Sequence, residues 1–314
     1  MNDVSSNIFV VMVFYNPIEE DIKHAQMLSE RYDGVVVDNS SSPSCESSMF
    51  SRFKYIANNE NLGIAEAQNK GIAEALKNSN TQFVVFIDQD SRLAPDYPEK
   101  IAEEFADISK THMKLALLGP TIINKETNEA YQSVFHPDNS NERFTHRREI
   151  ISSGSCMSRE AIEKVGVNNS RMFIDYVDFD WCWRANAMGY ECGTTKALSI
   201  NHKVGRGELH FGKINVSISA PFRYYYQYRN YQWLLRRSYV PGDWKLRMGI
   251  KQTLRFCYFP FLVKDGCKCW KYMAKGIWDG VRSSLQAKRP YGSSEELGTQ
   301  SSKFNEDRSN SCIV

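Results

Sequence analysis

The sequence predicts an α/β protein with a mostly parallel central sheet and helices on both of its faces. Short apolar runs, typical of buried strands, alternate with segments of helical spacing through about the first 120 residues. Several of these runs end in polar or acidic residues, as strands do when their carboxyl ends line a ligand site. With 314 residues, 42% of them apolar, the chain is long enough for one large domain and an appendage.

The chain opens with a β-α-β unit. Residues 8–14 form an apolar run that predicts a strand, and Pro17 ends it because proline donates no ladder hydrogen bond. Residues 19–31 have helical spacing, and the short run 35–37 predicts a second strand that ends at Asp38. Asp38 either caps the following turn or faces a ligand at the edge of the sheet.

A second unit follows. Residues 54–57 predict a short strand, and residues 64–76 predict a helix because they are rich in Ala, Glu, Gln and Lys. Asn61 and Gly63 lie just before this helix, where its N-terminus would expose unpaired N–H groups. Those groups could hold a phosphate, although ordinary capping explains most loops of this type.

The strand predicted at residues 83–88 ends in two carboxylates, Asp88 and Asp90. Two such side chains repel each other unless a cation or a proton intervenes. Mg²⁺ or Mn²⁺ prefers oxygen ligands and commonly completes its shell with substrate phosphates, which indicates a nucleotide diphosphate. The alternative is that Asp88 caps the next turn and Asp90 is merely solvated.

The alternation continues with a helix at 95–108 and a strand at 115–118, after which residues 124–148 form a long connection without a clear period. Small residues around Gly154 then precede a helix at 159–165, and they permit a ligand to approach the backbone closely.

A further acidic segment, residues 172–184, holds three carboxylates where an apolar stretch runs into a helix. One of them is well placed to be a general base, because a carboxylate beside bulky aromatics is partly desolvated. The alternative is that all three favour the helix dipole, and for Asp180 we prefer it. Residues 195–201 predict an edge strand, and His202 follows it as either a structural hydrogen-bonding residue or a ligand.

The net charge of +2 hides a strong asymmetry. Residues 221–290 contain fifteen Lys and Arg against three Asp and Glu, so they carry +12 and the remainder carries −10. Nucleic acid, an anionic membrane and a pyrophosphate-bearing substrate are all candidate partners. Residues 266–285 predict a basic amphipathic helix that either lies in a membrane interface or packs on the catalytic domain, with one apolar face made of Trp270, Met273, Ile277, Val281 and Leu285.

Three features bear on localisation and order. No stretch approaches the roughly 18 apolar residues that span a bilayer, and the N-terminus lacks a secretory signal, so we expect a cytoplasmic protein. The eight Cys lack paired CxxC spacing, which favours reduced thiols that bind no metal. Residues 291–314 are polar and Ser-rich, and we expect them to be disordered.

A set of short motifs carries a family resemblance: Val13–Pro17, Val37–Ser41, Asn59–Gly63 with Asn69–Gly71, Asp88–Ser91, Ser153–Ser155, Val177–Arg184, His202 and Arg223–Asn230. In this order they resemble the inverting family-2 glycosyltransferases, most closely the bacterial rhamnosyltransferase branch, over about residues 8–235. The resemblance implies a GT-A fold with a Rossmann-like sheet. It divides the chain into a catalytic domain (1–235, with a nucleotide-binding half at about 1–120 and an acceptor half at about 121–235), a basic amphipathic helical extension (236–290) and the tail (291–314).

The resemblance also implies roles for individual residues. Asp178 takes the place of the catalytic base, although the residue before it is Val177 rather than the usual acid. Asp90 and His202 match the family's ligands for Mg²⁺ or Mn²⁺. The donor nucleotide would contact Tyr15, Asn16, Asp38, Asn61, Gly63, Asn69 and Asp88, and the acceptor would contact Gly154, Ser155, Trp181 and Arg184.

The activity implied is transfer of L-rhamnose from dTDP-L-rhamnose to a lipid-linked saccharide in O-antigen or capsule synthesis. The choice of dTDP-L-rhamnose rests on the resemblance alone. We expect residues 236–290 to contact the anionic cytoplasmic face of the inner membrane, and we leave a homodimer open.

Three other functions compete. A nucleotidyltransferase also uses paired acids, but it usually has a Gly-rich basic loop after the first strand, where this chain is acidic. A nucleic-acid-binding module would explain the basic segment and leave the acidic sites unexplained. A lectin-like protein without turnover is the third alternative. We expect an enzyme, and we expect no nucleic acid partner.

Overall fold

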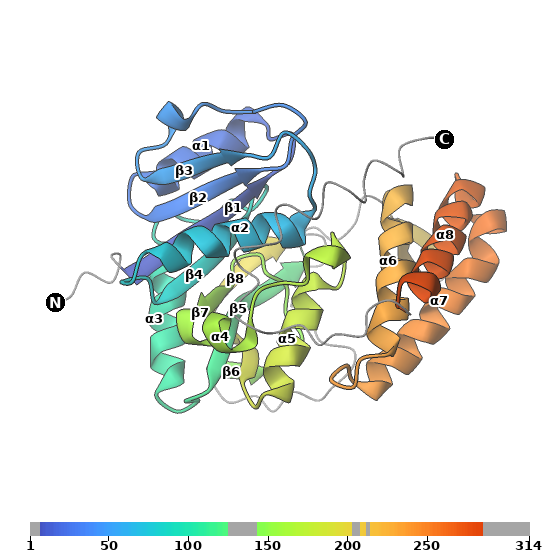
Figure 1. Ribbon diagram of the computed structural model, residues 1–314. Helices are drawn as coiled ribbons and strands as arrows, with labels where there is room; N and C mark the ends of the chain where they lie inside the picture. Colours follow the sequence, from blue (N-terminus) through green and yellow to red (C-terminus); the bar gives the residue numbers. More distant parts are fainter. Residues whose placement is uncertain (1–6, 125–142, 203–207, 212–213, 285–314) are drawn as a thin grey trace.

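The computed structural model describes residues 7–124, 143–202, 208–211 and 214–284. It contains an eight-stranded mixed sheet with helices on both faces and a separate layer of three long helices (Figure 1). The predicted α/β class with a helical C-terminal region is therefore confirmed. The predicted tail, residues 291–314, lies outside the described residues, and the domain boundary at residue 235 stays a prediction.

The first four strands run parallel, as strands joined by crossover helices do. Their order in the sheet is β3-β2-β1-β4. Register pairs Phe14 with Asp38 and Val13 with Asp88, so the carboxyl ends of β1, β2 and β4 meet at one edge. The strands are β1 (Ile8–Phe14), β2 (Asp33–Asp38), β3 (Phe53–Ala57) and β4 (Phe83–Asp88).

The second half of the sheet is mixed. β7 (Cys156–Ser158) lies between β4 and β5 (Leu115–Asn124) and is antiparallel to both. β8 (Glu191–His202) runs parallel to β5, and β6 (Phe144–His146) closes that edge as an antiparallel strand. The strand predicted at 195–201 is the second half of β8. Because β6 pairs only with residues 193–195, residues 199–201 pair with β5 alone among the described strands, as an edge strand does. Residues 208–217 supply the short ladder of β9 (Glu208–Phe211) and β10 (Ile214–Ser217).

Helices cover the two faces of the sheet with separate apolar clusters. Alternate residues of β1 point to opposite faces, as the period of a strand requires. Val10 and Met12 pack with the helices α1 (Glu19–Ser29) and α3 (Tyr97–Ser109). Val11 packs on the other face, where the helices are α2 (Ile64–Lys77), α4 (Arg159–Val165) and α5 (Val177–Ala187).

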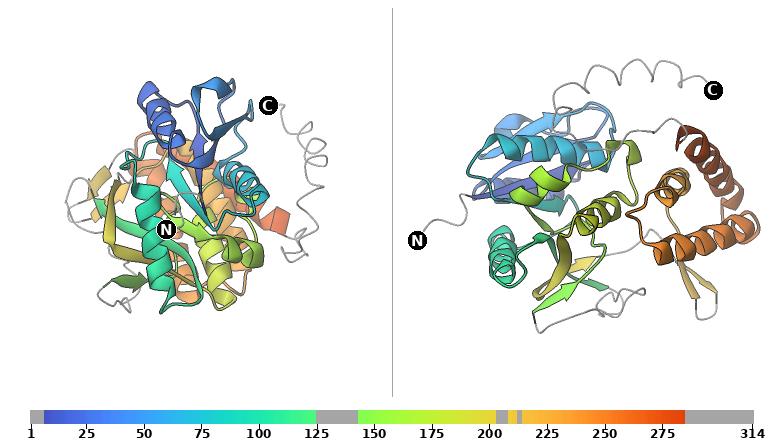
Figure 2. Two further views of the ribbon diagram at one scale, coloured as in Figure 1. Left: turned by 90° about the vertical axis from the view of Figure 1, so that its left-hand side faces the viewer. Right: turned by 60° about the horizontal axis from the view of Figure 1, so that its bottom comes forward.

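The C-terminal helices form a layer of their own, which the right-hand view of Figure 2 shows beside the sheet. They are α6 (Pro221–Leu235), α7 (Gly242–Leu262) and α8 (Gly266–Ser284). Met273, Cys269 and Phe259 pack against Tyr224 and Tyr228 of α6 in one buried cluster. Part of the apolar face predicted on α8 is thus used inside the protein.

Two smaller expectations concern single residues and helices. The seven cysteines that the structure describes are all free, as expected for reduced thiols. None of the helices in the described part of the chain combines the length and the apolar content that crossing a bilayer requires.

Candidate active site

The carboxyl ends of β1 and β4 are joined by a side chain that the sequence did not single out. Gln89 follows β4, and its Oε1 accepts the backbone N–H of Tyr15 at 2.7 Å while its Nε2 donates to the Tyr15 carbonyl at 3.3 Å. An amide makes this two-way bridge because it carries both a donor and an acceptor. The bridge fixes Tyr15 next to Asp88 and Asp90.

The loop before β7 brings a second set of polar groups to the same edge. The N–H of Gly154 donates to the Phe86 carbonyl at 2.8 Å, and the N–H of Phe86 donates to the Ser155 carbonyl at 2.9 Å. Gly154 has a φ of +69°, and a Cβ there would lie 2.8 Å from the Tyr97 hydroxyl oxygen. The position therefore requires glycine, and the close packing sets the loop beside the end of β4.

Asp178, in the first turn of α5, reaches this edge through that loop. The backbone N–H of Ser152 donates to Oδ2 of Asp178 at 3.2 Å. Burial raises the pKa of Asp178 to about 7, the Ser152 hydrogen bond acts against the rise, and the charge of Asp88 adds to it. A carboxyl group with a pKa near neutrality is suited to accept a proton at physiological pH.

The turn that delivers Asp178 is strained. Phe173, Asp175 and Tyr176 have φ values of 65°, 68° and 65°, a region that costs non-glycine residues about 1–3 kcal/mol each. Arg223 of α6 pairs with both carboxylate oxygens of Asp175. Such a backbone persists only where surrounding groups hold it in place.

Asn230, also in α6, holds the same turn from beneath. Its side-chain Nδ2 lies 3.0, 2.9 and 3.0 Å from the carbonyl oxygens of Met172, Ile174 and Asp175, and the residue is fully buried. One amide thus serves three carbonyls of the strained segment. The sequence motif Arg223–Asn230 thus supplies two residues that hold the turn leading to Asp178.

Asp38 lies at the predicted edge but is buried, with 1% of its surface exposed. Its carboxylate accepts the N–H groups of Ser40 and Ser44 at 2.8 and 3.0 Å and the Tyr55 hydroxyl at 2.6 Å. Burial acts to raise its pKa, and the hydrogen bonds from Ser40 and Tyr55 outweigh burial and lower it. Asp38 organises the loop after β2, and its contact with a nucleotide stays a prediction.

Asn16 joins the same loop. It has a φ of 49°, and its backbone N–H donates to Oγ of Ser40 at 2.8 Å. Asn tolerates this left-handed backbone better than most residues. The turn after β1 is therefore tied to the turn after β2, and Tyr15 is left exposed at the edge.

The N-terminus of α2 differs from the expected phosphate site. The N–H of Ala65 donates to the Phe173 carbonyl at 3.3 Å, so that group is not free. Gly63 has a φ of +84°, and a Cβ there would lie 2.6 Å from Phe173. Asn61 accepts the Gly63 N–H at 2.9 Å. Gly63 and Asn61 form a packed turn against the strained segment.

Asn69 has a structural role, and its contact with a nucleotide stays a prediction. Its Nδ2 donates to the Asn168 carbonyl at 2.8 Å and to Oγ of Ser170 at 3.0 Å, and its Oδ1 accepts the Asn168 N–H at 2.9 Å. Both polar atoms of the amide are thus used to tie α2 to the segment before α5.

Of the four predicted acceptor residues, Gly154, Ser155 and Trp181 are buried and Arg184 is partly exposed. Trp181 is 1% exposed, and its indole N–H donates to the Gly166 carbonyl. Arg184 donates to Asp180, Val165 and Val167. Ser155 is fully buried and donates to the Ser152 carbonyl. These side chains are thus engaged within the protein, and their contact with an acceptor stays a prediction. Gly154 shapes the loop through its backbone.

For the two predicted metal ligands the structure gives different information. Asp90 is exposed beside Asp88, and His202 is the last residue of β8, paired with Asn124. Within the described residues, no group of three or more His, Cys, Asp or Glu could hold a metal ion. Two carboxylates at one strand end still fit a divalent cation that takes its remaining ligands from substrate phosphates. The charge of Asp88 acting on Asp178 is consistent with a site that gains from such a cation.

Gln89, Ser152 and Asn230 are the residues that sequence reasoning missed as contributors to the site. Gln89 lies between Asp88 and Asp90, and the prediction from the sequence considered only these two carboxylates. Ser152 acts through its backbone N–H, and a backbone contact cannot be predicted from the residue type. Asn230 was quoted within a motif, but only the fold shows which carbonyls it binds.

Comparisons with known proteins agree with this geometry. Residues 9–166 match the family model described as glycosyl transferase family 2. The chain is 30% identical over 296 residues to a dTDP-rhamnosyl transferase, RfbF, of Shigella flexneri, covering 89% of this chain and 97% of that protein. It is 24% identical over 239 residues to the low-salt glycan biosynthesis hexosyltransferase Agl10 of Haloferax volcanii, covering 71% of this chain and 74% of that protein.

One solved structure is also similar, the crystal structure of GalNAc-T7 with UDP, GalNAc and Mn²⁺. The match has a TM-score of 0.45 and 12% identity, and it covers 91% of this chain and 57% of that one. At that level of similarity we draw no argument from its ligands.

Proposed function

The chain belongs to glycosyl transferase family 2, and from this premise we propose that it transfers L-rhamnose from dTDP-L-rhamnose to a lipid-linked saccharide. Enzymes of this family use nucleotide-sugar donors, so the reaction class follows from membership. The choice of L-rhamnose is supported by the relative from Shigella flexneri, which is 30% identical over most of both chains. O-antigen or capsule is the surface polysaccharide in which we place the product.

The position of Asp178 is the observation that best supports the mechanism. Its carboxylate would accept the proton of an acceptor hydroxyl as that oxygen attacks the anomeric carbon of the donor. The new carbon–oxygen bond forms on the face opposite the diphosphate, which leaves with the electron pair of the broken bond. The configuration at that carbon is inverted. A pKa of about 7 suits this role, because a carboxylate with an ordinary pKa is a weaker base.

Asp90, with Asp88 and His202, is the set that we propose for Mg²⁺ or Mn²⁺. A bound cation would offset negative charge on the departing diphosphate. Asp88 also lies close enough to Asp178 for its charge to add to the raised pKa of that carboxyl group.

The test is a panel of nucleotide sugars incubated with the purified protein and Mg²⁺ or Mn²⁺, with and without a chelator. The measurement is release of nucleoside diphosphate. If only dTDP-L-rhamnose releases nucleoside diphosphate, and a chelator stops the release, the result supports both the proposed donor and the requirement for a metal. Release from another donor only would contradict the rhamnosyl assignment and leave the family intact.

The rate should depend on pH through Asp178. The base works only when ionised, so kcat/KM should rise with pH, with a midpoint near 7, and level off above about 8. The measurement is a profile from pH 5 to 9 at subsaturating donor. A profile that is flat from pH 5 upwards, as expected for an Asp with an ordinary pKa, would contradict the raised pKa.

We also propose that the protein works at the cytoplasmic face of an anionic membrane, and that α7 rather than α8 provides the main contact. Leu246, Ile250, Leu254 and Phe261 recur at four- and seven-residue spacing on one face and are between 53% and 84% exposed. Arg247 and Lys251 flank this stripe. Exposed apolar side chains flanked by cations match an anionic lipid interface.

The apolar face predicted on α8 is partly buried and partly exposed. Met273 is fully buried and Ile277 packs against the same cluster, so the alternative of packing on the protein holds for these two residues. Trp270 and Val281 remain exposed, as does Trp278 beside them. The face of α8 is therefore a minor part of the proposed contact.

Replacing both Ile250 and Leu254 with Asp should reduce sedimentation with anionic liposomes severalfold at low salt. The change removes two apolar side chains and adds negative charge where the lipid is negative. Met113→Asp, at a site that is 88% exposed and outside the three helices, is the matched control and should sediment like the wild type. Equal sedimentation of the double variant would remove α7 from the contact.

A further inference from the structure

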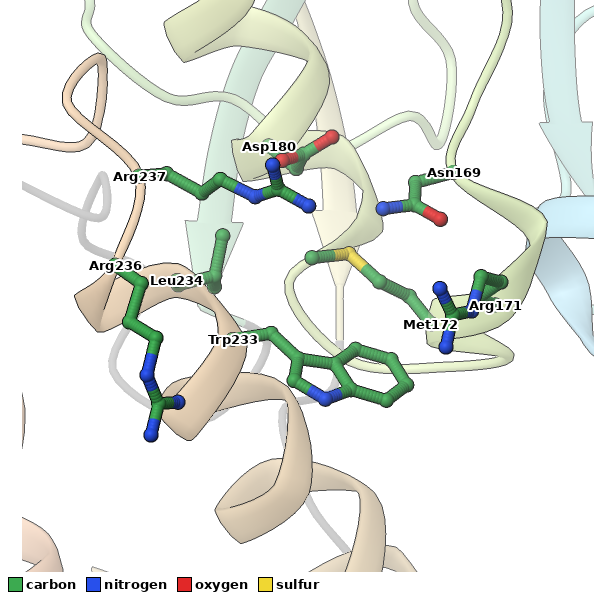
Figure 3. Close-up of a pocket in the computed structure, with 8 residues that line it drawn as sticks. All are labelled: Asn169, Arg171, Met172, Asp180, Trp233, Leu234, Arg236 and Arg237. Carbon is green, nitrogen blue, oxygen red and sulfur yellow. The ribbon is translucent and has the colours of Figure 1, made fainter. Parts of the chain in front are cut away.

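A cavity of about 230 Å³ lies on the side of α5 away from Asp178. Asp180 is in its wall, and residues two apart on a helix point about 200° apart, so Asp178 and Asp180 face opposite ways. The cavity is formed where the end of α6 approaches the segment before α5 (Figure 3). Its lining residues are Asn169, Arg171, Met172, Asp180, Trp233, Leu234, Arg236 and Arg237.

The cavity has an excess of positive charge. Three of its residues are arginines, and the ion pairs of the described residues leave Arg171, Arg236 and Arg237 without a carboxylate partner. The one acid, Asp180, is already engaged, since its Oδ2 accepts Arg184 at 3.1 Å and its Oδ1 accepts the Tyr239 hydroxyl at 2.7 Å. The cavity therefore attracts an anion rather than a cation.

Arg171 and Arg236 have contacts that hold them in place, and for Arg236 the contact is a hydrogen bond from its Nη1 to the Gln232 carbonyl at 2.7 Å. The ring of Trp233 has the Arg171 guanidinium carbon 5.3 Å from its centroid and that of Arg229 at 4.3 Å. The indole N–H of Trp233 donates to Oγ of Ser283 in α8 at 2.9 Å, which fixes the ring. Arg237 is half-buried, and in Figure 3 it reaches across the cavity from the side opposite Arg171. Guanidinium groups bind phosphate oxygens through paired N–H donors.

The surroundings and the size of the cavity indicate which kind of anion it binds. Arg236 and Arg237 in its lining come a few residues before α7 in the chain, and the exposed apolar stripe of α7 starts at Leu246. The cavity volume is several times the roughly 30 Å³ that one water occupies in the liquid, which leaves room for two linked phosphates. A ligand with a phosphate head and an apolar tail matches both features.

We propose that this cavity binds the diphosphate group of the lipid carrier of the acceptor. The identity of the carrier rests on the proposed function, whereas the diphosphate chemistry rests on the arginines. Binding here would hold the carrier on one side of α5 while its sugar reaches Asp178 on the other.

The experiment titrates the full chain with inorganic pyrophosphate and with farnesyl diphosphate by calorimetry, with saturating dTDP present to fill the donor site. Arg237→Gln should weaken binding of both probes at least tenfold. Arg31→Gln, which removes the same charge from an exposed pair with Glu99, is the control and should leave both affinities unchanged. Both variants should keep the wild-type melting temperature and dTDP affinity.

Three outcomes would overturn the proposal. Equal binding of the probes by wild type and Arg237→Gln excludes the cavity as the site. Inorganic phosphate binding as tightly as pyrophosphate indicates a general anion site. Binding of anionic phospholipid vesicles that depends on Arg237, without binding of farnesyl diphosphate, indicates a lipid headgroup site. If dTDP-L-rhamnose is not a donor but Arg237-dependent diphosphate binding persists, the donor assignment fails and the cavity assignment stands.

Discussion

Replacing Asp178 with Asn should lower kcat by about 10²- to 10⁴-fold, the range that general base catalysis contributes. The amide keeps the size of the side chain but cannot accept the proton of the acceptor hydroxyl. Affinity for dTDP should stay within about twofold of wild type, because Asp178 reaches the site from α5 rather than from the nucleotide-binding edge of β1 and β2. The measurements are steady-state kinetics with donor and acceptor, and calorimetry with dTDP.

The same variant should be more stable than the wild type at high pH. The pKa of Asp178 is raised from 3.8 to about 7, so its stabilising contribution is full below pH 3.8 and is lost as the pH rises to 7. Asn carries no charge at any pH, so its advantage grows over that window and reaches at most about 4 kcal/mol above it. Thermal melts at pH 5 and pH 8 measure the difference.

Asp107→Asn is the control for this variant, since Asp107 is an exposed acid of α3 far from the site. It should leave kcat unchanged. An active Asp178→Asn enzyme, or one that loses stability at pH 8 relative to wild type, would contradict the assignment of Asp178 as a buried base.

Asn230→Ala should cost about 2–4 kcal/mol of stability and reduce kcat at least tenfold. The change removes the hydrogen bonds from one buried amide to three carbonyls, and each lost bond is worth about 1 kcal/mol with a further cost for unsatisfied groups. Without them the positive-φ turn relaxes, and Asp178 shifts from the Ser152 N–H. Urea unfolding and kinetics below the melting temperature separate the two effects.

The matched control is Asn186→Ala, because Asn186 of α5 donates its amide to a single carbonyl, that of Arg148. It should lose about 1 kcal/mol and keep kcat within about twofold. If Asn230→Ala loses stability but retains full kcat at low temperature, then Asn230 supports the fold without positioning the base.

The strands β1 and β4 and the helices α2 and α4 could be predicted nearly to the residue, because their apolar periodicity is strong and their ends carry Pro, Asp or Gly. β7 was missed. Three residues are too few to show a period, and their place in the middle of the sheet depends on pairing with β4 and β5. β6 was missed for the same reason.

The candidate site shows a similar division. Asp88 and Asp90 were singled out because two carboxylates at the end of one buried strand repel each other, and Asp178 because a carboxylate beside bulky aromatics is partly desolvated. For Trp181 and Arg184 the motif does not say which way the side chain points, so their contact with an acceptor stays a prediction. Helix geometry turns Trp181 into the core, and only the fold reveals that Arg184 spans Asp180 and two backbone carbonyls.

The central place of β7 has a consequence for synthesis on the ribosome. β1 to β4 can pair as soon as residue 88 has emerged, but one edge of β4 stays open until residues 156–158 follow. For the time needed to add about 70 residues, the nascent chain presents an apolar strand edge on which another chain can dock. The order of the strands in the sheet thus requires that the open edge of β4 be kept away from other chains during translation.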